Sequence, residues 1–310
     1  MNKEIRDYAV YIGDVALDEY YRADRWPSIA DKENVKTLEA VPGGMIANAA
    51  CVRAGLGEKT LFWTCMNDGP ISRALLEDLE ERGIDTSLSV IDNSLPDSKT
   101  MIFLVKDEHT VFIPDIEIDH IDVTDEMVEV MKGASYIYST SGTLMSLRYK
   151  GRHWNDFSQE IRDAGTRVIV DFDVDYERNH DDKRFVTVDI GFFNETGYDS
   201  IRQDRSFEQQ AEKLHSLGMK LVVVTLAEKG CIIYQEGKQA IRIPARKTEV
   251  VDVTGAGDTF CSCFSSMMDE LGLIKAAEFA TAAASACISS MGARSGVRSK
   301  EEIYQILDKI

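Results

Sequence analysis

A glycine-rich turn in the C-terminal third of the chain contains the residue types best suited to chemistry. Residues Asp252–Asp258 form the sequence DVTGAGD, which follows two β-branched residues and precedes a long apolar stretch. Gly255 and Gly257 allow the backbone to adopt positive φ and to approach a ligand closely. The start of a following helix would add unpaired N–H groups and the positive end of its dipole, which attract anions. The turn Gly255-Ala256-Gly257 is therefore predicted to be an anion hole.

Asp258 places a carboxylate at the end of this turn. A negative charge beside an anion hole is unfavourable unless it handles a proton, so Asp258 is a candidate general base for phosphoryl transfer. The alternative is structural, with Asp258 or Thr254 capping the helix. Neither the Walker A pattern nor Gly-x-Gly-x-x-Gly occurs, because Gly257 is followed by Asp258, Thr259 and Phe260. Those two classes of nucleotide-binding site therefore lose support.

Short β-rich runs alternate with helical patterns along most of the chain. The predicted strands are Tyr8–Ile12, Thr60–Cys65, Tyr136–Tyr138, Arg167–Asp171, Val186–Phe193 and Leu221–Thr225. The predicted helices are Met45–Ala54, Ile71–Arg82, Thr124–Lys132, His153–Ala164, Phe207–Leu217 and nearly all of the chain from Ala256. This alternation predicts a doubly wound, mainly parallel α/β sheet with helices on both faces.

Two segments, 15–41 and 98–115, interrupt the alternation because they contain strand patterns without helices between them. They are predicted to form a small β-sheet lid on the α/β core. No Gly/Ser-rich or Pro-rich linker divides the chain. We therefore expect a single domain over residues 1–310.

The composition excludes several classes of function. Lys and Arg number 35 against 53 Asp and Glu, giving a net charge of −18, which argues against nucleic-acid binding. No apolar run reaches membrane-spanning length, and the first residues are too polar and acidic for a signal peptide. We therefore expect a cytoplasmic protein that binds no membrane and keeps its six cysteines reduced.

Two motifs, which follow each other along the chain in the family's order, resemble those of the ribokinase-like (PfkB) family of carbohydrate kinases. The family signature Asp-Thr-x-Gly-Ala-Gly-Asp corresponds to Asp252–Asp258, and Gly-Gly-x-x-x-Asn-x-Ala corresponds to Gly43–Ala50. The resemblance extends from Tyr8 to the C-terminus. It implies a kinase that uses ATP and Mg²⁺ to phosphorylate a hydroxyl group of a sugar or sugar-like small molecule.

The resemblance also implies roles for residues at the acceptor side of the site. Asp258 matches the catalytic base, and the amides of Gly255, Ala256 and Gly257 would hold the charge of the transferred γ-phosphoryl group. Five matched residues would contact substrate hydroxyls: Asp14, Asp18, Gly43, Gly44 and Asn48. A carboxylate accepts strong hydrogen bonds from hydroxyls, and an amide both donates and accepts. Asn48 as a capping or surface residue and Asp14 as a solvated acid are the structural alternatives.

The same resemblance assigns Asn194, Thr225 and Gly230 to the nucleotide. Asp252 would match a monovalent cation site, for example for K⁺. Glu195 is a candidate for contacting the divalent metal through water, because Gly197 stands where the family motif Asn-x-x-Glu has its glutamate.

Two further departures affect the sequence around the nucleotide and the cleft. Ala227 replaces the first glycine of Thr-x-Gly-x-x-Gly, which puts the close backbone approach there in doubt. Residues Asp171–Arg178, with acids at every second position from 171 to 175, are predicted to be a strand end near the cleft and receive no role.

Two alternative functions remain open. A nucleoside kinase of the same fold would need aromatic surfaces for the base, which Tyr20, Tyr21, Trp26 and Phe103 in the lid would supply. A regulator that binds ligand with weakened catalysis would explain Gly197 and Ala227. Because lid strands expose unpaired edges, a homodimer formed through the lid is expected in either case.

Overall fold

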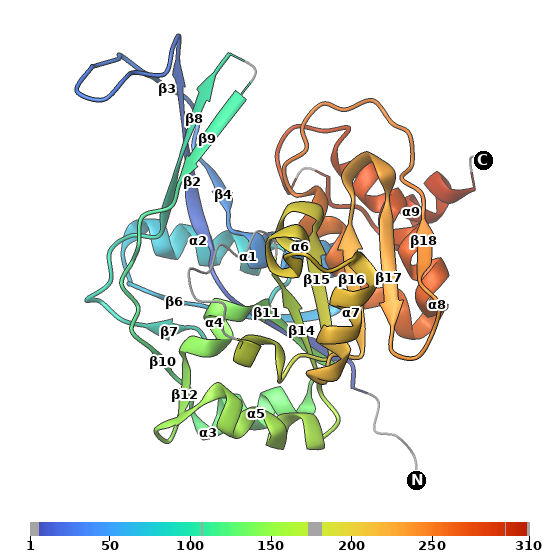
Figure 1. Cartoon of the computed structure of the whole chain (residues 1–310). Coiled ribbons are helices and arrows are strands. Elements are labelled where there is room, and N and C mark those ends of the chain that lie inside the picture. Colours follow the sequence, from blue (N-terminus) through green and yellow to red (C-terminus); the bar gives the residue numbers. More distant parts are fainter. Residues whose placement is uncertain (1–5, 107, 173–181, 295, 309–310) are drawn as a thin grey trace.

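The computed structural model describes residues 6–106, 108–172, 182–294 and 296–308. An eight-stranded sheet lies at its centre (Figure 1). In spatial order its strands are β18 (Ile241–Ile243), β17 (Cys231–Gln235), β16 (Leu221–Thr225), β15 (Ile190–Asn194), β14 (Arg167–Asp171), β11 (Tyr136–Thr140), β1 (Tyr8–Ile12) and β5 (Lys59–Trp63). Neighbours from β16 to β5 are parallel, and β17 is antiparallel to both of its neighbours. The predicted mainly parallel α/β sheet is confirmed.

The side chains of each central strand alternate between two hydrophobic cores. In β16, Leu221 and Val223 belong to the first core, whereas Val222 and Val224 belong to the second. Successive strand residues point to opposite faces, so a strand covered on both faces must be apolar at every position. This explains why the central strands appear in the sequence as uninterrupted hydrophobic runs.

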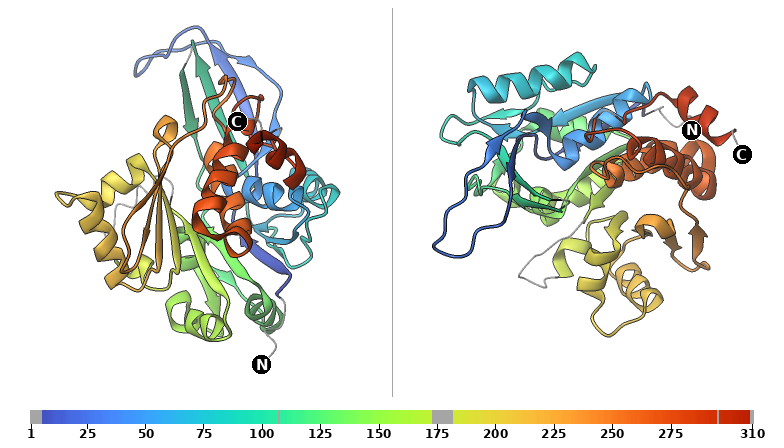
Figure 2. Two further views of the ribbon diagram at one scale, coloured as in Figure 1. Left: turned by 90° about the vertical axis from the view of Figure 1, so that its right-hand side faces the viewer. Right: turned by 90° about the horizontal axis from the view of Figure 1, so that it is seen from above.

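Helices cover both faces of the sheet (Figure 2). The first core lies beneath α1 (Met45–Gly55), α2 (Pro70–Glu81), α8 (Ala256–Cys287) and α9 (Lys300–Leu307). The second core lies beneath α3 (Asp125–Gly133), α4 (Ser141–Ser146), α5 (Trp154–Asp163), α6 (Glu195–Arg202) and α7 (Phe207–Ser216). Helix α8 is kinked at Gly272, whose φ is 75°.

The two segments that interrupt the alternation form a separate five-stranded sheet, here called the projecting sheet, which stands away from the central sheet in Figure 1. It contains β2 (Ala16–Ala23), β3 (Lys36–Thr37), β4 (Val41–Gly43), β8 (Lys99–Val105) and β9 (Glu108–Phe112). Strand β2 is parallel to β8 and antiparallel to β4, which places Ala16 opposite Gly43. The projecting sheet therefore leads directly into the Gly43–Gly44 motif.

Short strands complete the second face. They are β6 (Cys65–Met66) paired with β7 (Val90–Ile91), and β10 (Ile121–Asp122), β12 (Leu147–Tyr149) and β13 (Arg152–His153), which form a small sheet. The predicted strand 60–65 is therefore divided at Thr64 between β5 and β6.

The predicted strand 186–193 begins too early, because β15 starts only at Ile190. The reason lies in Asp189, which is buried and accepts hydrogen bonds from Arg162 and from the backbone N–H of Val168. Its carboxylate also pairs with Lys220. A side chain that joins three neighbouring segments in this way holds its own backbone in a turn before the strand.

All six cysteines are buried and none forms a disulfide. Among the described residues, none of the helices combines the length and the apolar character needed to cross a bilayer.

Candidate active site

The two glycine motifs meet where α1 and α8 begin. Asn48 lies in the first turn of α1 and is buried, with 7% of its surface exposed. Asp258 lies in the first turn of α8 and is partly exposed. The side-chain amide Nδ2 of Asn48 donates a hydrogen bond of 3.0 Å to Oδ2 of Asp258. Two side chains separated by 210 positions in the sequence therefore share one site.

Gly255 and Gly257, in the turn before α8, differ in whether the surrounding structure could accommodate a side chain. Gly255 is the N-cap of α8 with φ of 77°, and a Cβ there would lie 2.8 Å from Cα of Ala293. A Cβ at Gly257 would meet no described atom within 4 Å. The fold therefore requires Gly255, whereas Gly257 leaves open space against the backbone. The N–H of Ala256 donates to the carbonyl of Val253 at 3.2 Å, so this amide is already used within the turn.

The structure also decides the capping alternative. Because Gly255 occupies the N-cap position, neither Asp258 nor Thr254 caps α8. The hydroxyl of Thr254 donates instead to Asp252 at 2.7 Å.

Arg294 holds the Asn48 side chain from the other side, and the sequence analysis missed it. Its Nε donates to Oδ1 of Asn48 at 2.9 Å, and another guanidinium nitrogen donates to the carbonyl of Gly43 at 2.8 Å. The guanidinium also pairs with Asp78, and only 7% of the Arg294 side chain is exposed. Because the amide oxygen of Asn48 accepts from Arg294, its NH₂ group must face Asp258. A single arginine among small residues gives no spacing signal that could have revealed this role.

Asp18 lies against the early glycine motif. A Cβ at Gly43 would overlap the Asp18 carboxylate, so only glycine allows the acid this position. Gly44 has φ of 100°, and a Cβ there would lie 2.6 Å from the carbonyl oxygen of Asp14. Both glycines therefore let the motif approach the segment that joins β1 to β2. Part of Asp14 is exposed to solvent, but the protein atoms packed around its carboxyl group raise its pKa by desolvation.

Burial raises the pKa of Asp18 to about 6. A hydrogen bond from Thr100 and the positive charge of Arg294 oppose this shift, whereas the negative charge of Asp14 adds to it. Asp18 is therefore an acid whose charge changes within the physiological pH range.

The residues expected to contact the nucleotide lie at the carboxyl ends of β15 and β16, where Asn194 is paired with Thr225. Asn194 is the N-cap of α6, and its Oδ1 accepts a hydrogen bond of 2.7 Å from the N–H of Gly197. Gly230 has φ of 93°, and a Cβ there would overlap the carbonyl oxygen of Ile243. Asn194 therefore caps α6, and Gly230 allows the backbone to pass close to Ile243, whether or not either residue contacts a ligand.

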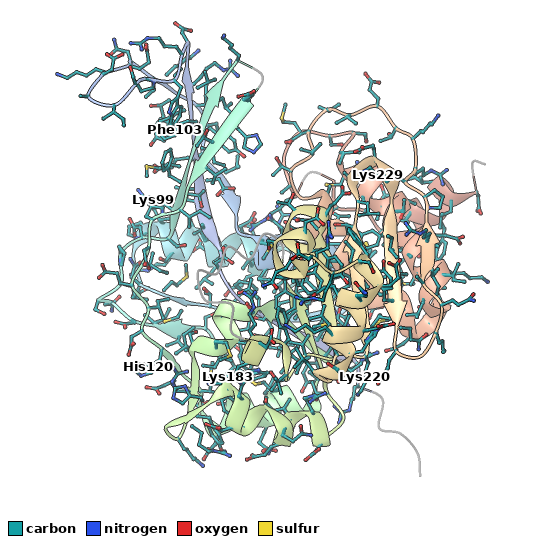
Figure 3. The ribbon with its side chains drawn as sticks, viewed as in Figure 1. Lys99, Phe103, His120, Lys183, Lys220 and Lys229 are labelled. Carbon is teal, nitrogen blue, oxygen red and sulfur yellow. The ribbon has the colours of Figure 1, made fainter. Side chains whose placement is uncertain are left out.

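Glu195 and Asp252 are the residues expected to contact cations, and their neighbours in the structure show what else each carboxylate binds. Glu195 pairs at 3.1 Å with Lys229, which is labelled in Figure 3. Mg²⁺ is commonly held by phosphates and only one or two carboxylates, so an acid at this edge fits that need. Among the described residues, no group of three His, Cys, Asp or Glu side chains could hold a metal ion.

Asp252 ties two loops together. Its Oδ1 accepts from the N–H and hydroxyl of Thr254, and its Oδ2 accepts from the N–H of Gly292 at 2.8 Å. Although burial alone would raise its pKa, these hydrogen bonds from Thr254 and Gly292 lower it, so the carboxylate is ionised. An ionised oxygen suits a monovalent cation, but both oxygens already serve to fix the loops that precede and follow α8.

Of the acids from 171 to 175, only Asp171 is described; residues 173 and 175 lie outside the described residues. Asp171 is buried at the end of β14 and accepts a hydrogen bond of 2.8 Å from the hydroxyl of Tyr138.

Comparison with known protein families matches residues 6–300 to the pfkB family carbohydrate kinase. The chain belongs to this family. As a PfkB protein it is a carbohydrate kinase, which agrees with the resemblance carried by the two glycine motifs. Ribokinase of Arabidopsis thaliana is 26% identical over 96% of this chain and 80% of its own length. Fructokinase-1 of Zea mays is 25% identical over 86% of this chain and 88% of its own length.

The PfkB fold also appears in solved structures. Arabidopsis thaliana ribokinase complexed with ribose and ATP matches with a TM-score of 0.83 and 23% identity, covering 98% of each chain. The likeness extends over the central sheet, its helices and the projecting sheet together, because nearly the whole chain is covered.

Replacing Arg294 with methionine is expected to reduce kcat/KM by about 10- to 100-fold, because a hydrogen bond to a charged group contributes about 1.5–3 kcal/mol. Without Arg294 the Asn48 amide is free to rotate away from Asp258. Steady-state kinetics, corrected for the folded fraction from a thermal melt, measures the effect.

Arg82→Met is the matched control for this experiment. Arg82 also hydrogen-bonds the Asp78 carboxylate, but it is 37% exposed and bonds the acid one turn away on α2. Equal kinetic losses in the two variants, or full activity in folded Arg294→Met, would contradict the orienting role.

The pKa of Asp18 gives a second prediction. Below about pH 6 this acid is protonated and accepts fewer hydrogen bonds from hydroxyls, so kcat/KM is expected to fall as the pH drops through about 6. Asp18→Asn is expected to lose this acidic limb and to reach a lower plateau. A pH profile of kcat/KM from pH 5 to 8 for both proteins checks it.

The pH dependence of stability has the opposite sign to that of kcat/KM. Because burial disfavours the charged form, the free energy of unfolding should decrease as pH rises from about 4 to about 6, and Asp18→Asn should weaken that trend. If the pH profile of kcat/KM for Asp18→Asn still fell below about pH 6, the titration would belong to another group.

Proposed function

We propose that this enzyme transfers the γ-phosphoryl group of ATP to a hydroxyl group of a sugar or sugar-derived small molecule. Asp258 acts as the general base, and the turn Gly255–Gly257 at the start of α8 acts as the anion hole. The observation that carries the proposal is the hydrogen bond between Asn48 and Asp258, because it joins the acceptor-binding motif to the phosphoryl-binding motif. The solved structure of Arabidopsis thaliana ribokinase complexed with ribose and ATP supports the same pair of ligands.

In this mechanism the chain mainly positions the reactants. The acceptor hydroxyl binds beside the Asn48–Asp258 pair, and the Asp258 carboxylate accepts its proton as the oxygen attacks the γ-phosphorus and the bond to the leaving ADP breaks. Phosphoryl transfer has a loose transition state and depends on alignment and charge stabilisation, so a carboxylate is a sufficient base. The open backbone at Gly257 and the positive end of α8 stabilise the negative charge that develops.

Other residues orient the two ligands. Asp18 and the backbone of Gly43 and Gly44 bind the remaining hydroxyls of the acceptor, with Asp14 as a second acid at the rim. On the nucleotide side, Asn194, Thr225 and Glu195 lie at adjacent strand ends where the phosphates would pass. Mg²⁺, when bound with ATP, would neutralise phosphate charge, and Glu195 is the described acid best placed to contact its water shell.

The aromatic residues of the projecting sheet favour a sugar over a nucleoside. Tyr21 stacks on Phe103 with ring centroids 5.2 Å apart, and Trp26 packs edge-on against Phe103 at 5.9 Å and stacks on Phe112 at 6.0 Å. These rings pack on one another, although Trp26 and Phe112 keep 49% and 44% of their surface exposed. Tyr20 differs, because its pKa is raised by burial and by the charges of Asp18 and Asp252, which indicates that it faces the site.

Asp258→Asn is expected to reduce turnover by at least about 10³-fold, the usual contribution of a general base, while ATP binding is largely retained. A coupled ADP-release assay over ribose, fructose and a set of nucleosides, with ATP binding measured by calorimetry, checks this. Asp269→Asn is the control, because this acid lies on the same helix, pairs with Arg167 and is 68% exposed. Turnover of Asp258→Asn within tenfold of the wild type would remove the base assignment.

We also propose that the enzyme is a homodimer formed through the projecting sheets. Every residue of edge strand β9 is exposed, including Val111 and Phe112 at 44% each. Two such edges can protect each other by pairing. Light scattering during gel filtration is expected to report the mass of two chains, and Val111→Lys is expected to shift it to one.

Val186→Lys serves as the control for the dimer, because Val186 is also 44% exposed but lies outside the projecting sheet. A wild-type protein with the mass of one chain, or equal behaviour of the two lysine variants, would disprove this interface.

A further inference from the structure

A cavity of about 250 Å³ lies on the second face of the central sheet, beside the candidate active site. Its walls come from the carboxyl ends of β1 and β5, from α4, and from Ser98 at the base of the projecting sheet next to the labelled Lys99 (Figure 3). The proposed mechanism uses only one of its lining residues, Asp14.

The cavity adjoins the acceptor side of the site at Asp14. Asp14 lies on its rim, and the Asp14 carbonyl is the group that approaches Gly44. The charge of Asp14 also reaches Asp18. In addition, the carbonyl of Ser98 accepts a hydrogen bond of 3.0 Å from the N–H of Leu17, the residue before Asp18. A molecule bound at Asp18 and Asn48 can therefore extend past Asp14 into this space.

Most of the lining is apolar. Ile12, Ile121, Val123 and Leu147 are all less than 10% exposed, and they form its inner surface. An aliphatic cavity of about 150 Å³ binds benzene in water, so a cavity of this size has room for one aromatic ring. Hydroxyl-rich sugars would not be stabilised by such walls, because their polar groups would lose water without gaining partners.

One residue of the lining, Trp63, carries a polar atom that has no partner among the described residues. The indole Nε1–H of Trp63 is buried and makes no hydrogen bond within the described residues. By contrast, the indole Nε1–H of Trp154, in the same core, donates to the hydroxyl of Thr187 at 2.9 Å. An unmet buried donor is destabilising, so an acceptor on a ligand that reaches Trp63 would bind favourably.

We propose that the acceptor substrate is a sugar that carries an apolar, single-ring substituent with one hydrogen-bond acceptor, and that this cavity binds the substituent. The inference rests on the proposed function, because the hydroxyl-bearing half must occupy the site at Asn48 and Asp258. A nucleobase suits the cavity less well, since its edges carry several donors and acceptors that each need a partner.

The test compares matched substrates: a free pentose or hexose, its phenyl glycoside and its pyridyl glycoside. The wild-type enzyme is expected to phosphorylate the phenyl glycoside with at least about tenfold higher kcat/KM than the free sugar, the usual effect of filling an apolar pocket. The pyridyl glycoside, which adds an acceptor for Trp63, is expected to exceed the phenyl glycoside. Equal kcat/KM values for the free sugar and both glycosides would overturn the proposal.

Two variants locate the effect. Ser146→Leu places a larger side chain in the cavity and should reduce the ratio of glycoside to free-sugar kcat/KM at least tenfold. Ser216→Leu is the matched control, because both serines donate their hydroxyl to the carbonyl three residues earlier, while Ser216 is exposed on α7. Trp63→Phe should remove the advantage of pyridyl over phenyl. Identical ratios for Ser146→Leu and Ser216→Leu would count against the cavity.

A binding measurement separates this proposal from the proposed function. Fluorine NMR of a fluorophenyl glycoside reports binding without any turnover. If no sugar releases ADP but the glycoside binds the wild type and not Ser146→Leu, the phosphoryl-transfer proposal fails and the cavity assignment holds. If free sugars are phosphorylated and the fluorophenyl glycoside neither binds nor reacts, the cavity assignment alone fails.

Discussion

The site depends on the close packing of the first turns of α1 and α8. Residues 46–53 of α1 are buried, and most of them are small, which allows the two helix backbones to approach. The buried hydroxyl of Ser262 donates to the carbonyl of Ala49 at 2.6 Å and also contacts the hydroxyl of Tyr11 at 3.0 Å. A larger residue in either helix would separate them. The Asn48–Asp258 hydrogen bond exists because this interface places both side chains at the same end.

Arg294 adds a buried positive charge at the end of an interface that is built mainly from small residues. Its guanidinium satisfies an amide, a backbone carbonyl and a carboxylate at once, which is the arrangement that makes a buried cation tolerable. The same charge lowers the pKa of Asp18, which burial alone would raise further. Arg294 therefore affects both residues proposed to bind the acceptor: it lowers the pKa of Asp18 and orients the amide of Asn48.

Much of the fold could be predicted from local patterns. Strands buried on both faces must be apolar at every position, so β1, β14 and β16 were located with their observed bounds. The short helix α4 was missed because its six residues contain no amphipathic period, and its cap, Thr140, is also the last residue of a strand. The hairpin of β17 and β18 was also missed, since an antiparallel edge breaks the β–helix alternation.

The candidate site was predictable where glycine spacing carried the information and unpredictable where contacts joined distant segments. The motifs at Gly43–Asn48 and Gly255–Asp258 were found as local patterns, and their meeting follows from the α/β topology. Ala227, which replaces a family glycine, adopts φ of 49°, so the backbone keeps the left-handed conformation despite its side chain. Arg294 could not be found because its partners lie about 220–250 positions earlier in the chain.

The bond from Arg294 to the carbonyl of Gly43 spans 251 positions and has a consequence for biosynthesis. Ribosomes synthesise a chain from its N-terminus, whereas a domain generally folds as a unit. The segments of the projecting sheet and α1 are therefore synthesised while the loop beyond α8 has yet to be translated. Until that loop emerges, the Asn48 amide lacks Arg294, the partner of its oxygen, even though Asp258 has already been synthesised. The residue that orients the amide is therefore added to the site last.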